Sequence, residues 1–584
     1  GTFPEQDINI SKPIRMVREK GTTVNIGGTI TLDNVQGDIV LRDFPINVNN
    51  NGKLIIQNCS KVGLEDLSLI PQGVQIINST VIIRSCQFSN SLTISGDSDV
   101  QLIDSNLKNV TTTGSKVQVI DTVLLALNST DSNLTIARST HTTGTITRGQ
   151  TLYHGSTASG DVTINASDWR AHGSTFKGNL TSTNAHSNLL RSTVEKGFTH
   201  NGASKDCVVF QSTVGRNNSG NSELFSDANR TWVTYSTFHH AWQYGGKEAH
   251  FVLNNILTDH KKAMLPLILG GSDCKYYINN NYFFNNGADR GNQTNQIGPI
   301  TNNTWKLIKT LRGGIITKVT NRIHIGGDYY SSDRSTHCKA RFFYTDGTSN
   351  DVQKTRKNSK YSNGQGWGDQ TYNNPHPSKV VTKIEIHLYS QDNGHEKDTT
   401  VYDATSSGEI LVGDSKKVSI HNNWFRRPNE YSHCIFIDQV PDDGLTIHGN
   451  VFWRDSGTWR AHAVFAPAGG ECSHNYFHHS TYSVTGGIAN FDNLVGADPK
   501  IDTSTWLLKE GSPLIDAGPE EPHFKDHDGS RNDIGMFGGH AYDPAGKTST
   551  NPVVLSGTQN IVRMNVGDTT PLIIKSRGAV STSN

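Results

Sequence analysis

The chain has 584 residues, and its 53 lysines and arginines balance its 53 aspartates and glutamates. This balance excludes a global charge that would attract nucleic acid or an acidic membrane surface, so we expect no nucleic-acid partner. No apolar run approaches the roughly 18 residues that a membrane-spanning helix needs, so we expect no membrane span.

A three-residue pattern recurs along the chain: a small polar residue, any residue, and then usually an apolar one. Its first residues are Cys86, Ser105, Thr122, Ser139, Ser156, Ser174, Ser192, Ser212, Ser236, Asn255 and Asn281, and it resumes at Asn423, Asn450 and Asn475. The spacings are 17 to 27 residues, apart from one gap of 142. A repeat of about 20 residues indicates a solenoid, in which each repeat forms one rung.

Short stretches around each repeat, such as Val81–Ile83 and Val117–Ile120, have the character of strands and show almost no helical periodicity. A rung of 17 to 20 residues is too short for a helix and a strand, so it predicts two or three short strands bent into a coil. Stacked coils would form parallel sheets and align the small polar residues into hydrogen-bonded ladders. We expect Cys86, at one of these positions, to be a buried and unreactive thiol.

Segments such as Ile420-His421-Asn422-Asn423-Trp424-Phe425 give the chain its family resemblance. The chain resembles the right-handed parallel β-helices of the pectin-lyase-like superfamily over residues 1–300 and 409–548. Gly1–Ile14 resembles the first rung of many secreted members, and Ser512–Gly518 with Asp526–Gly535 resembles the usual closing segment. The resemblance implies a secreted or cell-surface protein whose capping segment precedes Gly1, so we expect the chain to begin after processing or truncation.

We expect four parts: the N-terminal β-helix (1–303), an insert (304–408), the C-terminal β-helix with its closing segment (409–548), and an extension (549–584). Longer alternating strands such as Lys383–Tyr389 predict that the insert is an antiparallel β-sandwich. Its loop around Trp367 is similar to the sugar-facing loop of a carbohydrate-binding module, although a role in packing or assembly fits equally well. Strand-like runs in the extension would lie along the chain's own helix or complete a sheet on a neighbouring copy, giving self-association.

Rungs between Ser105 and Ser192 have no spare length and predict a bare shaft, whereas rungs beyond Ser212 gain polar, aromatic and ionisable residues. In parallel β-helix enzymes such loops wall a substrate groove. Aromatic rings stack on sugars and guanidinium groups pair with carboxylates, so the loops predict an acidic polysaccharide as partner. The candidate substrate-binding residues are Trp242, Tyr244, Arg426, Arg427, Trp453 and Trp459, together with Trp367 in the insert.

A polysaccharide lyase needs a cation to stabilise the enolate-like anion and a base to remove the C5 proton. Two sets of residues could supply them: Lys247 with His240 and His260, and Arg454 with Arg460 and His462. Hydrolysis would instead need paired carboxylates, for which Asp438, Asp442, Asp443 and Asp455 are candidates, although Asp442-Asp443-Gly444 is more typical of a turn. No catalytic motif of the chondroitinase-B-like, alginate or pectate lyases is present.

We expect no cofactor and no metal. Calcium is the alternative, on Asp526, Asp528 and Asp533, although a structural turn fits these residues better. The leading interpretation is a secreted β-helix protein that binds an acidic polysaccharide and cleaves it by β-elimination. The alternatives are a non-catalytic extracellular surface, sheath or fibre protein that self-assembles, and a spike-type receptor-binding fibre.

Overall fold

The computed structural model describes a set of segments along the chain, and the statements below concern these segments. They are residues 2–3, 7–17, 24–26, 28–43, 45–48, 52–69, 73–215, 224–238, 241–244, 249–253, 255–258, 267–284, 293–296, 306–314, 318–325, 335–357, 370–376, 379, 381–390, 396–402, 410–427, 434–437, 440–454, 463–466, 468–478, 483–496, 498–502, 507–526, 528–539, 542, 553–559 and 574–579. The chain divides into two compact units, Gly1–Phe238 with Pro544–Asn584, and His239–Asp543.

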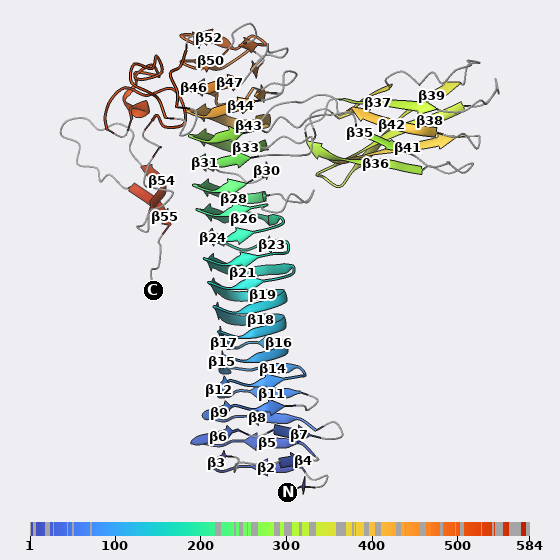
Figure 1. Ribbon diagram of the computed structural model, residues 1–584, viewed down its shortest axis with the longest axis vertical. Helices are drawn as coiled ribbons and strands as arrows, with labels where there is room; N and C mark the ends of the chain where they lie inside the picture. The colour runs from blue at the N-terminus through green and yellow to red at the C-terminus, as the bar shows by residue number, and fades with distance from the viewer. Residues whose placement is uncertain are drawn as a thin grey trace. The chain divides into compact units, whose positions relative to one another are not determined.

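Short strands dominate the first unit (Figure 1). They are β1 (Thr2–Phe3), β2 (Ile8–Ile10), β3 (Ile14–Val17), β4 (Val24–Ile26), β5 (Ile30–Asp33), β6 (Asp38–Arg42), β7 (Pro45–Val48), β8 (Leu54–Gln57), β9 (Lys61–Glu65), β10 (Ser68–Leu69), β11 (Val74–Ile77), β12 (Thr80–Arg84), β13 (Gln87–Phe88), β14 (Leu92–Ser95), β15 (Asp99–Ile103), β16 (Asn106–Thr113), β17 (Lys116–Ile120), β18 (Val123–Ala137), β19 (Thr140–His154), β20 (Thr157–Ala158), β21 (Val162–His172), β22 (Thr175–Phe176), β23 (Leu180–Thr183), β24 (Ser187–Leu190), β25 (Thr193–Val194), β26 (Phe198–Phe210), β27 (Thr213–Val214), β28 (Leu224–Thr234) and β29 (Thr237–Phe238), with β54 (Val553–Gln559) and β55 (Ile574–Ala579) near the C-terminus.

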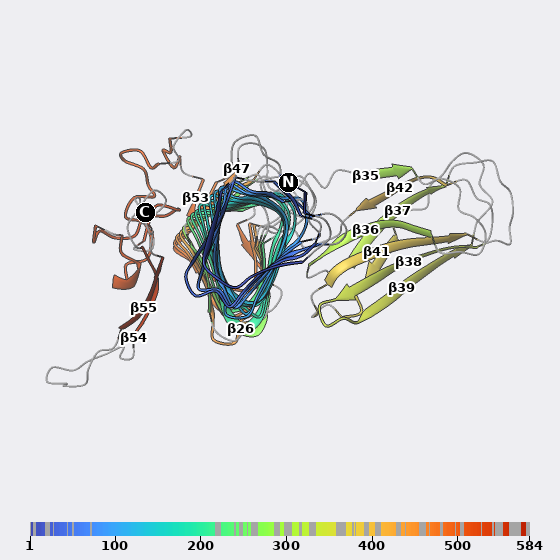
Figure 2. The ribbon, with the colours of Figure 1, turned by 90° about the horizontal axis from the view of Figure 1, so that it is seen from below.

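These strands form three parallel sheets that wind around a common core, as the view along the axis shows (Figure 2). Sheet 1 runs from β2 and β5 through β14 and β23 to the first half of β28. Sheet 2 runs from β3 and β6 through β17 and β24 to the second half of β28. Sheet 3 runs from β1 and β4 through β13 and β22 to β29. Long strands such as β18 and β19 bend through the corners and contribute to all three sheets. The predicted all-β parallel solenoid is therefore confirmed.

The coils turn at corners where one residue adopts the left-handed backbone conformation. Asp104, Asp121 and Arg138 hold this conformation on successive rungs after sheet 2, with φ of 48°, 50° and 48°. Gly155 and Gly173 continue the same column at 55° and 59°. Aspartate and glycine tolerate positive φ, which explains most of this column, and Arg138 donates two hydrogen bonds to Asp121 at 2.8 and 2.7 Å that hold the corner.

The recurring small polar residues form the predicted ladder inside the solenoid. The Ser105 hydroxyl accepts a hydrogen bond from the backbone N–H of Cys86 at 3.0 Å and donates one to the carbonyl of Ile103 at 2.8 Å. The same arrangement links the rungs on either side of Ser139 and Ser212. Each hydroxyl therefore satisfies a buried backbone group of the neighbouring rung, which fixes the register.

The reactivity of Cys86, which occupies one position of this ladder, offers a chemical test of its burial. The side chain is fully buried, and burial raises the pKa of its thiol to about 11, so almost no thiolate forms near neutral pH. Six cysteines are buried and form no disulfide: Cys59, Cys86, Cys207, Cys274, Cys434 and Cys472. We expect iodoacetamide to leave these six cysteines unmodified in the native protein and to label them after denaturation, as mass spectrometry of peptides would record. Native labelling of Cys86 would contradict this account.

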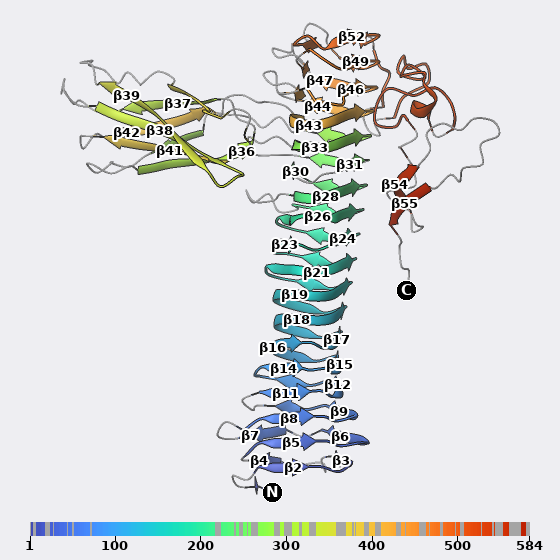
Figure 3. The same cartoon turned by 180° about the vertical axis from the view of Figure 1, so that it is seen from behind.

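The second unit holds a further solenoid segment, an insert and a closing segment (Figure 3). Its elements are β30 (Ala241–Tyr244), β31 (Ala249–Leu253), β32 (Ile256–Thr258), β33 (Leu267–Asn279), β34 (Tyr282–Phe284), β35 (Gln293–Gln296), β36 (Lys306–Gly314), β37 (Lys318–Ile325), β38 (Ser335–Tyr344), β39 (Ser349–Lys357), β40 (Gln370–Asn373), β41 (Val381–Ser390), β42 (Glu396–Tyr402), β43 (Ile410–His421), β44 (Trp424–Arg427), β45 (Ile435–Ile437), β46 (Leu445–His448), β47 (Val451–Arg454), β48 (Val464–Phe465), β49 (Glu471–Ser473), β50 (Tyr476–Phe477), β51 (Val484–Thr485), β52 (Ala489–Phe491), β53 (Leu494–Val495) and the 3-10 helix η2 (Pro522–Phe524).

Asparagine replaces serine in the ladder of this unit. The Asn450 amide donates to the carbonyl of Ile420 at 2.8 Å and to Oδ1 of Asn475 at 2.9 Å, and its Oδ1 accepts from the backbone N–H of Asn423 at 2.9 Å. Two residues later on each rung, phenylalanines stack with ring centroids 4.7, 5.0 and 4.8 Å apart along the column Phe283, Phe425, Phe452 and Phe477. The predicted polar ladder and apolar stack are both confirmed.

The insert interrupts the solenoid, yet the strands on either side of it still pair, with shifts of register between Leu269 and Lys275 of β33. β33 pairs with β43 and β34 pairs with β44, so the rungs before and after the insert are direct neighbours. Between them lie two antiparallel four-stranded sheets, β35-β42-β37-β40 and β36-β41-β38-β39. Buried Phe342, Ile384 and Ile386 give one of these sheets an apolar face. The antiparallel strands are confirmed, and β35 belongs to them although it precedes residue 304. A face-to-face sandwich stays a prediction.

The closing segment packs on the outside of the last rungs. Ile501, Leu514 and Ile534 join Trp424 and Tyr476 in one buried cluster. The side-chain amides of Asn280 and Asn422 donate to backbone carbonyls of Met536 and Asp533 at 3.1 and 2.7 Å. Near the C-terminus β54 and β55 pair antiparallel with each other. Among the residues that the structure describes, no helix is long and apolar enough to cross a membrane.

Candidate functional site

Most residues predicted for the site fall where the structure gives no side-chain description. Lys247, His240, His260, Arg460, His462, Trp459 and Trp367 lie outside the described residues. For Trp242 and Tyr244 in β30, Arg427 in β44 and Arg454 in β47, only the strand is described. The catalytic and sugar-binding roles assigned to these residues stay predictions.

Two predicted residues are brought together. Arg426 and Trp453 are register partners on β44 and β47. The indole of Trp453 stacks on the imidazole of His478, with centroids 3.9 Å apart and planes inclined by 8°, and it also packs against the core of the closing segment. Because His478 covers one face of the indole, that face is already occupied and a sugar cannot stack there.

Long connections gather at one corner of the second solenoid segment, between sheet-3-type and sheet-1-type strands. β32 ends at Thr258 and β33 begins at Leu267, while β44 ends at Arg427 and β45 begins at Ile435. The β47–β48 and β50–β51 connections occupy the same position in later rungs. The insert also follows a strand of this type, β34. Much of the added length in this unit therefore lies at this corner, although the connection from β45 to β46 is as long as that from β44 to β45.

The carboxylates considered for hydrolysis or calcium have structural roles where they are described. Asp442 and Asp443 form a turn in which the N–H of Gly444 bonds to the carbonyl of Pro441 at 3.2 Å, so the predicted turn is confirmed. Asp438 and Asp455 lie outside the described residues. Asp526 accepts from backbone N–H groups of the closing segment, and burial raises the pKa of its carboxyl to about 6. Within the described segments, no three His, Cys, Asp or Glu side chains converge as metal ligands.

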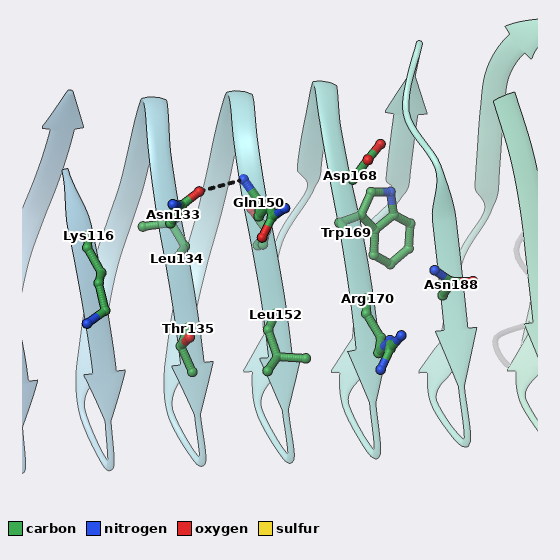
Figure 4. Close-up of a pocket in the computed structure, with 11 residues that line it drawn as sticks. Lys116, Asn133, Leu134, Thr135, Gln150, Leu152, Asp168, Trp169, Arg170 and Asn188 are labelled. Carbon is green, nitrogen blue, oxygen red and sulfur yellow. Dashed lines mark hydrogen bonds between the residues drawn. The ribbon is translucent and has the colours of Figure 1, made fainter. Parts of the chain in front are cut away.

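A groove of about 460 Å³ lies on the outer face of sheet 2, in the part of the shaft with short rungs (Figure 4). Its residues come from β17, β18, β19, β21 and β24. Two columns of outward side chains line it: Lys116, Asn133, Gln150 and Asp168 in one, and Thr135, Leu152, Arg170 and Asn188 in the other. Successive members of a column lie one strand apart, about 4.8 Å.

Buried side chains beneath the columns fix the strands that carry them. Trp169 points inward and is only 2% exposed, and its indole N–H donates to the Ser182 hydroxyl at 2.9 Å. The ring also meets Phe198 edge-on, with centroids 5.8 Å apart. Because neighbours in a strand point to opposite faces, an anchored Trp169 holds Asp168 and Arg170 outward.

Some charged side chains in the groove have a partner of opposite charge or a hydrogen bond, and one does not. Lys116 pairs with Asp99 at 2.9 Å, and Asp168 accepts a hydrogen bond from the backbone N–H of His186 at 3.1 Å. Arg170 is exposed, and among the described residues no acidic side chain pairs with it. One end of the groove therefore presents an unmatched guanidinium.

Two histidines lie on the same outer face beside Arg170. His172 stacks on His154 of the previous rung with centroids 5.4 Å apart and planes inclined by 5°. Burial, followed by the charges of His154, Arg191 and Arg170, lowers the pKa of His172. The imidazole of His172 is therefore neutral at neutral pH, and the fixed positive charge at this end of the groove comes from Arg170.

Sequence reasoning missed this groove because it located function by rung length. The available signal was the repeated pair of outward residues in the 17- and 18-residue rungs, for example Asn133 with Thr135 and Gln150 with Leu152. These pairs align only once the register is known.

The fold is a parallel β-helix. No protein-family model matches the chain, and no curated protein matches it in sequence. Among solved structures, the enzymatically active domain of tailspike protein 4 from Bacteriophage CBA120 is 10% identical, with a TM-score of 0.18 and coverage of 65% of this chain and 63% of that one. The chain thus spans less than two thirds of that structure's length.

A second similar structure is a double mutant of the tailspike protein of E. coli bacteriophage HK620. It is 9% identical, with a TM-score of 0.20 and coverage of 69% of this chain and 87% of that one. At these scores the similarity carries no argument, and the β-helix rests on the strand pairings described above.

Proposed function

We propose that the chain binds an extended acidic polysaccharide along the outer face of sheet 2. The observation that carries the proposal is the groove itself, with two columns of side chains in register on consecutive rungs, all of them polar except Leu152. A polysaccharide presents hydroxyl groups at regular intervals, and a column of side chains about 4.8 Å apart can meet several of them at once.

The side chains of the groove suit a sugar chain. The amides of Gln150 and Asn188 each offer a donor and an acceptor, as sugar hydroxyls require, and Asn133 offers its N–H donors while its Oδ1 accepts from the backbone N–H of Gln150 at 3.2 Å (Figure 4). Leu152 is 38% exposed and supplies an apolar contact for the C–H face of a sugar ring. The unmatched Arg170 favours a polysaccharide with carboxylates, because a guanidinium pairs bidentately with a carboxylate.

Replacing Arg170 tests the proposal. We expect Arg170→Ala to raise the Kd for an acidic polysaccharide about tenfold, since a lost charge-assisted hydrogen bond costs about 1.5 kcal/mol. Titration calorimetry against a panel of acidic and neutral polysaccharides would measure this. Arg148→Ala is the matched control, because Arg148 pairs with Asp131 at a corner outside the groove. Equal affinities for wild type and Arg170→Ala would refute the assignment of this groove.

Cleavage by β-elimination stays a prediction of the sequence, because the residues chosen for it lie where no side chain is described. The same incubations test it, since each cleaved bond leaves an unsaturated sugar end that absorbs ultraviolet light. Binding without such absorbance across the panel would contradict lyase activity and leave the binding proposal intact.

The self-assembling surface or fibre protein remains the alternative, and an extracellular location remains part of either proposal. Sedimentation over a range of concentrations distinguishes the two functions. Concentration-dependent polymers with no affinity for any polysaccharide would favour assembly.

A further inference from the structure

The outer face of sheet 1 differs from the other faces of the shaft. On seven consecutive rungs it carries two columns of hydroxyl or amide side chains and no charged residue. The first column is Thr93, Thr111, Asn128, Thr145, Thr163, Thr181 and Thr199, and the second is Ser95, Thr113, Thr130, Thr147, Asn165, Thr183 and Asn201.

The two columns form a regular two-dimensional lattice. Neighbours in a column are one strand apart, about 4.8 Å, and the two members of a rung are two residues apart along the strand, about 6.7 Å. The register runs without a bulge from β14 to the first half of β26. The coils of this unit stack along a common axis in the axial view (Figure 2), so the two columns run along the shaft. β-branched threonine has few rotamers, which holds each hydroxyl and methyl group in place.

The groups of this lattice are exposed or half-buried. Within the described segments, the outward threonine hydroxyls make no hydrogen bond to the protein. The short rungs add no loops beside them, because 17 or 18 residues suffice for one coil. Among the described residues, the face is therefore a double row of hydroxyl, methyl and amide groups, bordered at one corner by the ion pair of Arg148 with Asp131.

Other faces of the same rungs lack this lattice. Sheet 2 presents Lys116, Asp168 and Arg170. Sheet 3 has one outward threonine column that includes Thr140, but Lys177 and Glu195 stand two residues beyond that column. The uncharged double array is specific to sheet 1 and is not a general property of the shaft.

We propose that the outer face of sheet 1 binds crystalline water, the prism face of ice. Oxygen atoms on that face repeat in two perpendicular directions with spacings close to those of the array. Threonine hydroxyls and asparagine amides can take the places of lattice waters, and the methyl groups order the water between them. The proposal is independent of the polysaccharide groove, which lies on sheet 2.

Two other occupants fit less well. The array is about 30 Å long and two side chains wide, on the order of 300 Å², whereas a stable protein interface needs about 800 Å² from each partner. A second copy of the chain would therefore be held weakly. A polysaccharide would find neither an aromatic ring nor a cation among the fourteen positions.

The test uses the full chain and slowly growing polycrystalline ice. We expect the wild-type protein to be enriched in the ice, to lower the freezing point below the melting point and to inhibit recrystallisation. The double variant Thr145→Tyr, Thr163→Tyr should lose all three effects, because two exposed rings lift the face away from a planar solid. Thr140→Tyr, an exposed substitution on sheet 3 of the same rung, should behave as the wild type.

Circular dichroism and melting curves establish that the variants are folded, and Thr163→Lys serves as a second, single substitution at an exposed position. Exclusion of the wild-type protein from ice would overturn the proposal, as would full enrichment of both array variants. Sedimentation adds a third outcome: a wild-type dimer that the array variants abolish, without enrichment in ice, would overturn it in favour of a second copy.

Discussion

Acidification from pH 6.5 to about 4 is expected to destabilise the N-terminal solenoid through two histidines in its core. His141 and His200 are 2% and 0% exposed. Burial lowers the pKa of both imidazoles from 6.5 to about 4, with His186 lowering and Asp206 raising that of His200 by smaller amounts. Nε2 of His141 and both ring nitrogens of His200 are buried without a hydrogen-bond partner, so a proton placed on them gains no hydrogen bond, and only Nδ1 of His141 lies near an acceptor, the carbonyl of Thr143 at 3.2 Å.

The sign follows from the direction of the shift. Between pH 6.5 and 4 the unfolded chain binds a proton at each histidine and the folded chain does not, so the free energy of unfolding falls as the pH falls. The contribution of these two histidines to the free energy of unfolding is fully present above pH 6.5 and fully lost below pH 4. Each histidine contributes about 3 kcal/mol to this loss, and the two act on the same stretch of shaft.

Urea melts at several pH values measure this effect. The double variant His141→Phe, His200→Phe removes both titrations while keeping a ring of similar size, so its stability should depend less on pH than that of the wild type. His523→Phe is the matched control for the loss of an imidazole ring, because His523 is exposed in η2. Parallel pH profiles for wild type and double variant would contradict the prediction.

The second large effect is expected at Asn450, in the middle of the asparagine ladder. Asn450→Ala removes hydrogen bonds to Ile420, Asn423 and Asn475 at once and leaves buried polar groups on both neighbouring rungs without partners. Each buried group left unsatisfied costs about 1–3 kcal/mol, so we expect a loss of at least about 3 kcal/mol in the free energy of unfolding.

Serine offers a graded comparison at this position. In the first unit a serine hydroxyl accepts the backbone N–H of the previous rung, as Ser236 does for Ser212 at 3.1 Å. Asn450→Ser should therefore lose less stability than Asn450→Ala. Asn106→Ala, at an exposed position, controls for loss of an asparagine side chain. Denaturant melts compare the variants, and equal stability of Asn450→Ala and wild type would contradict a ladder that supports the fold.

The sequence was sufficient to predict what repeats locally. The small polar tripeptide predicted the coil, the ladder and the core stack, because each depends on residue types at fixed offsets such as Asn423 and Phe425. The 142-residue gap predicted the insert. The sequence Asp442-Asp443-Gly444 predicted a turn in the C-terminal part of the solenoid. All of these are properties of one segment or of its spacing to the next.

The groove and the array could not be predicted in the same way. Both consist of outward residues in strands that look ordinary alone, such as Thr145 on sheet 1 and Leu152 on sheet 2. The columns that these residues form can be recognised only when neighbouring rungs are aligned residue by residue. The length of the rungs indicated the longer loops instead. The roles of Lys247 and Arg460 in those loops stay predictions.

The direct pairing of β34 with β44 has a consequence for how this chain can change. The insert leaves the solenoid after Phe284 and returns at Ile410, at the corner where neighbouring rungs connect β32 to β33 and β44 to β45. A domain grafted at this point adds almost no constraint to the host, since Phe283 and Phe425 already stack across the join at 4.7 Å. Modules could therefore be exchanged at this point, in evolution or in the laboratory, while β34 and β44 remain paired.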